Sequence, residues 1–219
     1  MIEQERKVRK DKKVDIKPTI SVDLKECIYR LSYITNKPVK DVALHICDYA
    51  LHSKEIMEIL SESFRRNLTI HNTLYMGDLN RTSLAKARKK EDYPKERISL
   101  RVSKTTYENI CKLNYALDVT PTMATAILLE TCLLYSDYVN ENARSYLEQN
   151  LDLKRIKELE KVIKYVNEHN PYEEEVSWGA LLSFLMDEIK TGTTNVAQLI
   201  NDWLDWGLCS NGTKSRNKH

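Results

Sequence analysis

Glycine and proline are scarce in this chain, with five of each among 219 residues. This scarcity leaves room for few tight turns and favours a mainly helical fold. The glycine-rich loops GxGxxG and GxxxxGK[ST] are absent, which argues against nucleotide binding by those routes. No apolar run reaches the length of a membrane span, and the first residues lack the apolar core of a signal peptide. We therefore expect a cytoplasmic protein with no membrane partner.

Cysteine and histidine residues show none of the spacings that are typical of enzyme or metal sites. The five cysteines are odd in number and form no CxxC pair, so free thiols in a reducing compartment are expected. The five histidines show no HExxH or similar spacing, and no histidine cluster or carboxylate set accompanies a tyrosine nucleophile. We predict that the protein is not an enzyme, with no catalytic residues, no metal site and no cofactor.

Charge is present in quantity but is unevenly distributed. The formal net charge is only +2, yet residues 1–139 hold 24 Lys and Arg against 19 Asp and Glu, whereas residues 140–206 hold 7 against 13. Basic residues gather further in 6–17 and in 81–97. A basic front and an acidic back are expected when one end of a protein meets a polyanion. The alternative is that both basic runs are solvated, disordered segments.

Residues 97–102 alternate polar and apolar side chains, which predicts a short strand with one buried and one exposed face. Ser103 follows as a helix N-cap, and the pair Thr120-Pro121 predicts the start of a second helix. A single short strand followed by helices has no sheet to join. It must pair either with a second strand of the same chain or with a strand of another chain.

The order strand, helix, helix, capped helix occurs twice in the sequence, which indicates an internal duplication. A nearly constant shift in residue number relates the two copies. Matched positions include Ile28 with Ile110, Leu31 with Leu113, Tyr33 with Tyr115 and, after a shift longer by one position, Ser53 with Ser136.

The predicted organisation follows from this repeat. The expected parts are a disordered basic arm (1–13), a first unit with an extra helix (14–67), a basic linker (68–96), a second unit with an extra helix (97–149), a C-terminal helical module for oligomerisation or partner binding (150–207) and a disordered tail (208–219).

The pattern in residues 96–134 resembles the ribbon-helix-helix (MetJ/Arc-type) family of DNA-binding proteins. A weaker match lies near residues 15–52. The resemblance implies a mainly α fold in which tandem ribbon-helix-helix units share a short two-stranded antiparallel ribbon, completed by the C-terminal helices. In that family the ribbon enters the major groove of double-stranded DNA, where base edges display a readable pattern of donors and acceptors.

Site residues are implied by the same resemblance. The outward-facing strand residues would read bases, and the N-terminus of each second helix would bind a phosphate. The base readers are then Arg97, Ser99, Arg101, Lys17 and Thr19. The phosphate-binding residues are Thr120, Thr122, Lys37 and Lys40.

The strand of the first copy has two possible registers. A strand over residues 19–24 alternates well but turns Asp23 toward DNA and shortens the following helix. A strand over residues 15–20 with Ser21 as the cap restores the helix and presents Lys17 and Thr19, although it puts Pro18 in the strand, where it cannot donate to the ladder. The second register is favoured slightly because it aligns the helices without a gap.

The function that the resemblance implies is sequence-specific DNA binding, most simply as a transcriptional repressor. The alternative is an accessory DNA-binding factor of a plasmid or mobile element, acting as a scaffold in transfer, partition or copy control. A helical protein-binding module without nucleic acid is a further alternative. Pairing of the strands within one chain or between two chains stays open, as does a homodimer or higher oligomer through the C-terminal helices.

Overall fold

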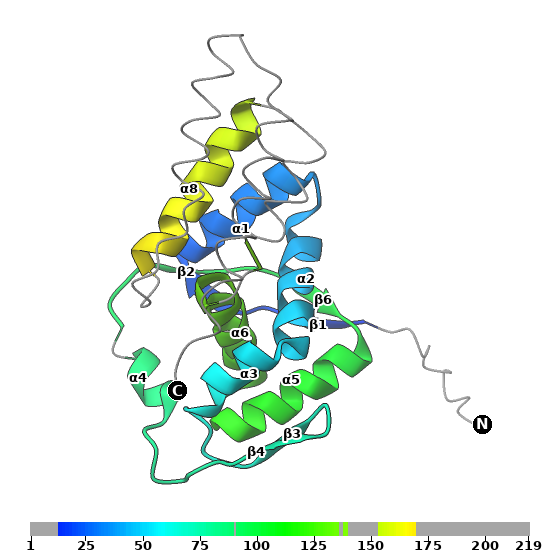
Figure 1. Ribbon diagram of the computed structural model, residues 1–219, viewed down its shortest axis with the longest axis vertical. Helices are drawn as coiled ribbons and strands as arrows, with labels where there is room; N and C mark the ends of the chain where they lie inside the picture. The colour runs from blue at the N-terminus through cyan, green and yellow to red at the C-terminus, as the bar shows by residue number, and fades with distance from the viewer. Residues whose placement is uncertain (1–12, 90, 136–137, 140–152, 170–219) are drawn as a thin grey trace, which may run out of the picture.

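The computed structural model of the chain describes residues 13–89, 91–135, 138–139 and 153–169. Over these ranges the chain is mostly helical, with small two-stranded antiparallel sheets (Figure 1). In chain order the elements are β1 (Val14–Ile16), β2 (Thr19–Ser21), α1 (Val22–Thr35), α2 (Val39–His52), α3 (Lys54–Ser61), β3 (Leu68–Ile70), β4 (Thr73–Tyr75), α4 (Leu84–Lys89), β5 (Lys95–Arg97), β6 (Leu100–Val102), α5 (Lys104–Leu117), α6 (Pro121–Tyr135) and α8 (Leu153–His169).

Two of the sheets form one ribbon. β1 pairs with β6 and β2 pairs with β5, both antiparallel, and one register runs through both pairings. Pro18 has no N–H to donate, which interrupts the ladder, but its carbonyl still accepts a hydrogen bond from the Ile98 N–H at 3.1 Å. We call residues 14–21 and 95–102 together the ribbon. Both strands come from one chain, so no second chain is needed to complete it.

The register of the first strand is the one that helix alignment favours. β2 ends at Ser21 and α1 begins at Val22, so Asp23 lies in the first turn of α1 and not in the strand. Lys17 and Thr19 are exposed, whereas the alternate side chains of the strand are buried. The second strand of the ribbon begins at Lys95, two residues before the predicted start at residue 97, and it is divided into β5 and β6 because Pro18 lies opposite Ile98 where the ladder is broken.

The two strand-helix-helix segments repeat with a constant shift in residue number. Ser21 and Ser103 each cap a 14-residue helix by accepting a hydrogen bond from the N–H three residues later, at 3.2 and 3.0 Å. The two helices end at Asn36 and Asp118, which both adopt the left-handed backbone conformation, with φ of 53° and 56°.

The second helices of the two copies keep the same shift. α2 begins at Val39 and α6 begins at Pro121, so the lengths of the first helix and of the break after it are preserved. The predicted caps and breaks that fall on described residues are therefore confirmed. Ser136, the predicted counterpart of Ser53, lies outside the described residues.

The core lies between the inner face of the ribbon and the paired helices. α2 and α6 pack against each other and against the ribbon. α6 is apolar on every side and almost wholly buried, as expected of a central helix. The ribbon contributes five buried aliphatic side chains to this core: Ile16, Ile20, Ile98, Leu100 and Val102.

Residues 68–96, predicted to be a basic linker, contain secondary structure of their own. β3 and β4 form a hairpin through His71 and Asn72, whose positive φ values of 47° and 62° fit a two-residue turn. Leu68 and Ile70 of this hairpin are buried. The short helix α4 and the strand β5 follow before residue 97. Strands of three residues are too short to show periodicity in sequence, so the sequence pattern does not indicate β3 and β4.

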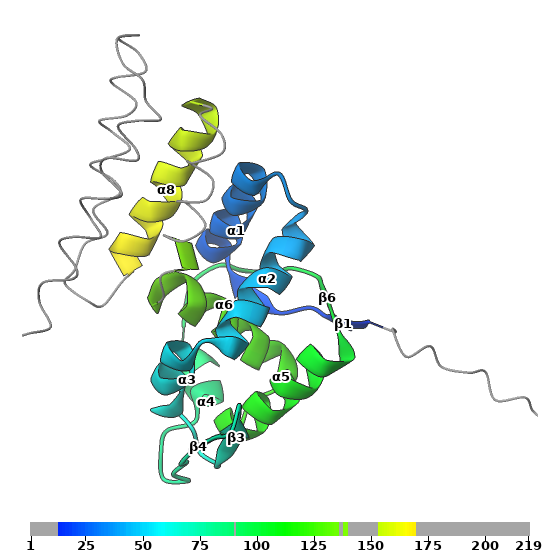
Figure 2. The ribbon, with the colours of Figure 1, turned by 45° about the vertical axis from the view of Figure 1, so that its right-hand side comes forward.

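The C-terminal part that the structure describes belongs to the same core. α8 lies along α1, as both views show (Figures 1 and 2), and also contacts α6. Ile156, Leu159 and Val162 are fully buried in the shared core. Residues 153–169 are therefore not a separate module. The rest of the predicted module, the tail and residues 1–12 of the basic arm lie outside the described residues.

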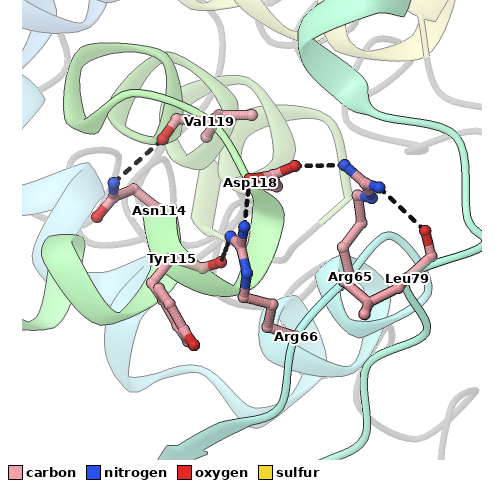
Figure 3. Close-up of polar contacts among 7 residues, drawn as sticks. All are labelled: Arg65, Arg66, Leu79, Asn114, Tyr115, Asp118 and Val119. Carbon is pink, nitrogen blue, oxygen red and sulfur yellow. Dashed lines mark hydrogen bonds and ion pairs between the residues drawn. The ribbon is translucent and has the colours of Figure 1, made fainter.

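The turn between α5 and α6 is held by the loop after α3 (Figure 3). The Asp118 carboxylate forms ion pairs with Arg65 and Arg66, and the Arg66 Nη2–Asp118 Oδ1 distance is 2.8 Å. Arg66 also donates to the Tyr115 carbonyl at 2.8 Å, and Arg65 donates to the Leu79 carbonyl at 3.0 Å. The segment between the two copies thus fixes the second copy against the first.

Candidate nucleic-acid interface

The outer face of the ribbon consists of the side chains that point away from the helices. Alternation brings six of them together on the two paired strands, and all six are exposed. They are Asp15, Lys17, Thr19, Arg97, Ser99 and Arg101. All five residues predicted to read bases lie in this set, and three cations face one anion across it.

The outer face has an approximate two-fold arrangement. The register places Lys17 opposite Ser99. The shift that relates the two copies also converts Lys17 into Ser99, so they are equivalent residues and mark the centre of the ribbon. Asp15 lies opposite Arg101 on one side of this centre, and Thr19 lies opposite Arg97 on the other. Strand pairing and sequence repeat together define this centre.

Asp15 is a functional candidate that the sequence reasoning missed. Its Oδ1 lies 2.9 Å from the Arg101 Nε, and the two side chains are 58% and 70% exposed. Such an exposed ion pair is weak because solvent screens it. The signal was available, since the alternation that turns Lys17 outward also turns Asp15 outward.

The N-terminus of α6 lies beside the β2–β5 end of the ribbon. Thr120 accepts a hydrogen bond from the Met123 N–H at 3.3 Å, and its hydroxyl lies 3.0 Å from that of Thr122. Both threonines are exposed, and both line a hollow that Thr19 also lines. The structure therefore brings these two predicted phosphate-binding residues next to a predicted base reader.

The N-terminus of α2 is the equivalent position in the first copy. Pro38 is its N-cap and supplies no side-chain hydrogen bond to the helix. Lys37 and Lys40 are both exposed there, as predicted, but Asp41 adds an acidic side chain to the first turn. The positive charge of this flank is therefore partly offset, which the resemblance alone does not indicate.

Many basic residues of the predicted linker are engaged in structural contacts. Arg81 donates to two backbone carbonyls at 2.6 and 3.1 Å, and Arg88 forms an ion pair with Glu130 of α6. Lys95 forms an ion pair with Glu91 at 3.2 Å. Only part of the basic cluster seen in the sequence is thus available to a partner.

The buried thiols of Cys27 and Cys47 are protonated and therefore poor nucleophiles. Burial raises the pKa of Cys27 to about 12 and raises that of Cys47 further still, so neither is ionised near neutral pH. Cys132 is also a buried free cysteine, and Cys111 is only partly buried. Among the described residues no three His, Cys, Asp or Glu side chains are grouped to hold a metal ion.

Of the described helices, none taken singly has both the length and the apolar composition needed to cross a membrane. α5 and α6 meet those criteria only together, as a pair bent by 93°.

Comparisons with protein-family models, with curated protein sequences and with solved structures found no match to this chain. Its function is therefore inferred from the geometry and charge of the described residues.

Proposed function

We propose that this chain is a sequence-specific double-stranded DNA-binding protein, built as a single-chain ribbon-helix-helix pseudo-dimer. The ribbon would enter the major groove with its outer face toward the bases. The major groove of B-DNA admits a two-stranded ribbon and presents a distinct pattern for each base pair. A ribbon of this kind needs a polar outer face and a rigid helical support behind it.

The observation that carries the proposal is that the two equivalent strands of the repeat pair with each other and present a polar outer face. Two strands of one chain pair so that the central residues, Lys17 and Ser99, are equivalent positions of the duplication. Pairing about a local two-fold axis places both strands side by side on one polar face, which is how a dimeric β-ribbon is presented to the groove.

The outer face supplies the chemistry of base reading. Arginine makes a bidentate contact to guanine, and serine and threonine accept or donate to any base. Arg97 has no ion pair with a described residue, whereas Arg101 is held by Asp15. We therefore assign the main guanine contact to Arg97 and a secondary contact to Arg101, which must first leave Asp15.

The helix N-termini supply orientation on the backbone. Free N–H groups and the helix dipole favour an anion at the starts of α2 and α6. Thr120 and Thr122 at one flank, and Lys37 and Lys40 at the other, would bind phosphates and set the position of the ribbon without reading sequence.

Repression of transcription is the cellular role that we propose for this DNA binding, by occupancy of a promoter. The accessory role in plasmid transfer, partition or copy control uses the same ribbon. Footprinting on native DNA separates the two roles, because a transfer origin or a centromere-like array in place of a promoter would identify the accessory factor.

Selection of binding duplexes from a random pool tests base reading. On the selected duplex, Arg97→Ala is expected to weaken the binding free energy by about 1–3 kcal/mol and to relax the preference at one base pair. Arg101→Ala is expected to weaken the binding free energy less, because the Arg101 guanidinium of the wild type is already paired with Asp15. Lys37→Gln is the matched control and should weaken binding to all duplexes alike.

Two outcomes contradict the proposal. Absence of binding to random duplex at low salt would exclude a DNA-binding role, since phosphate neutralisation makes such binding strongest there. Equal losses of Arg97→Ala on selected and random duplexes would show that Arg97 contacts the backbone and does not read bases.

A further inference from the structure

The segment between the two copies borders a hollow beside the ribbon, and the proposed function uses only the threonines of this hollow. Its volume is about 210 Å³. It lies where β2, β5, the N-terminus of α6 and the segment from α4 to β5 meet. Among its lining residues are polar and cationic side chains of β2, of the N-terminus of α6 and of the segment from α4 to β5: Thr19, Thr120, Thr122, Arg88, Lys89 and Tyr93.

We propose that this hollow binds a backbone phosphate of duplex DNA just beyond the β2–β5 end of the ribbon. Lys89 and the nearby Lys86 would supply the positive charge. The inference rests on the proposed function and adds to it. The segment after α3 would then be a third DNA-contacting part of the chain, in addition to the ribbon and the helix N-termini.

The acidic residues of the hollow are already neutralised from within. Glu130 is paired with Arg88, which fixes α4 onto α6. Glu91 accepts hydrogen bonds from Tyr93 at 2.6 Å and from Lys95 at 3.2 Å. These contacts hold the segment against the ribbon, so its position does not depend on a ligand.

Lys89 remains as the uncompensated charge. It lines the hollow and is exposed, and no described residue forms an ion pair with it. Lys86 is exposed three residues earlier in α4 and so shares its face of the helix. Thr19, Thr120 and Thr122 line the same hollow as Lys89, so a cation and hydroxyl groups are available to one anion there, which is the chemistry that a phosphodiester oxygen requires.

Basic residues also precede the strand of the first copy. The adjacent pair Arg88-Lys89 precedes β5, and the adjacent pair Arg6-Lys7 precedes β1 in the sequence.

The test measures how the affinity of the full chain for a labelled random-sequence duplex depends on salt. Each phosphate contact that is lost lowers the slope of log affinity against log salt by about 1. We expect Lys89→Gln to lower the slope by about 1 and Lys86→Gln/Lys89→Gln to lower it further. Lys112→Gln, an exposed lysine of α5 that does not line the hollow, is the control and should leave the slope unchanged.

The outcomes separate this inference from the function on which it rests. An unchanged slope for both variants, in chains that melt like the wild type and that still lose base preference on Arg97→Ala, overturns the phosphate contact alone. No binding of the wild type to duplex overturns both. If inorganic phosphate shifts the amide resonances of Thr120 and Thr122 but the duplex does not, the hollow binds a small anion and the proposed DNA contact is wrong.

Discussion

At the residue scale, the acidic side chain of Asp15 opposes the function proposed for the ribbon. It faces outward among three cations and is the one anion among the six described residues of the outer face. A carboxylate there repels every phosphate equally and competes with bases for Arg101. We infer that Asp15 lowers affinity for random DNA and so favours discrimination between sites.

Asp15→Asn is expected to raise affinity for random-sequence duplex by roughly threefold to tenfold at low salt, because the variant removes a repulsive charge and frees Arg101. Fluorescence anisotropy measures the change. Glu108→Gln, which alters an exposed carboxylate of α5, is the control. Equal affinities of Asp15→Asn and wild type would show that Asp15 does not face the DNA.

Gly77 is a second residue whose identity the structure constrains. A Cβ added there would lie 2.4 Å from the backbone of Arg66, the residue that pairs with Asp118. Gly77→Ala must therefore push the loop after α3 away from the turn between α5 and α6. We expect a loss of about 1–3 kcal/mol in the free energy of unfolding, measured by denaturant melts. Leu74→Ala, at an exposed side chain nearby in sequence, should cost far less, and similar losses for both variants would contradict this account.

At the scale of elements, caps and breaks were the most predictable features. Ser21, Ser103 and Ser53 cap helices as the sequence indicates, because a serine before an apolar helical face satisfies a free N–H. Alternation predicted the outward residues of 97–102, whereas those of the first strand also required the register that helix alignment favours. Such features depend on a few neighbouring residues, which is why one sequence suffices to predict them.

The segment between the copies could not be predicted in the same way. The β3–β4 hairpin has only three residues in each strand, and α4 has only six residues. Their positions depend on distant partners, such as Glu130 for Arg88 and Ala116 for the backbone of Arg65. No local pattern in the sequence predicts contacts between residues so far apart along the chain.

The contact between Glu91 and β5 predicts a dependence on pH. Burial pushes the pKa of Glu91 upward, but hydrogen bonds from Tyr93 and Lys95 favour its ionised form and hold the pKa below its ordinary value. Its contribution to stability is therefore present above the unfolded pKa, about 4.3, and is lost as pH falls through the lower folded pKa.

Thermal melts of wild type and Glu91→Gln at several pH values test this dependence. Near neutral pH the melting temperature of the wild type should exceed that of Glu91→Gln. The difference between the two melting temperatures should vanish in acid, below the folded pKa of Glu91. A difference that persists unchanged in strong acid would show that Glu91 acts by packing and not by charge.

At the scale of the whole molecule, one chain contains both halves of the ribbon. The alternative of pairing with a second chain is not needed, because both strands of the ribbon are paired within the chain along its length. The core is also continuous, since α8 buries Ile156 and Leu159 against the same helices. Sequence alone left the pairing open, because each strand is equally able to pair with its copy in the same chain or in another.

We therefore predict that one chain binds one duplex site. Sedimentation of the complex at protein concentrations near the dissociation constant should give the mass of one chain plus one duplex. Contacts between chains through residues outside the described ranges would add higher species only as concentration rises. A complex that contains two chains at the lowest concentration at which binding is seen would contradict the single-chain ribbon as the reading unit.

The proposed mode of binding places the middle of the outer face in the major groove. Ser99→Cys places a thiol at that centre, and the test is disulfide formation with a selected duplex that carries a thiol tether on a base in the major groove. We predict a cross-link with this duplex beyond the background of the native cysteines, and none with the tether in the minor groove. Cross-linking that is no stronger than for wild type, or that is equal for both tethers, would contradict the claim.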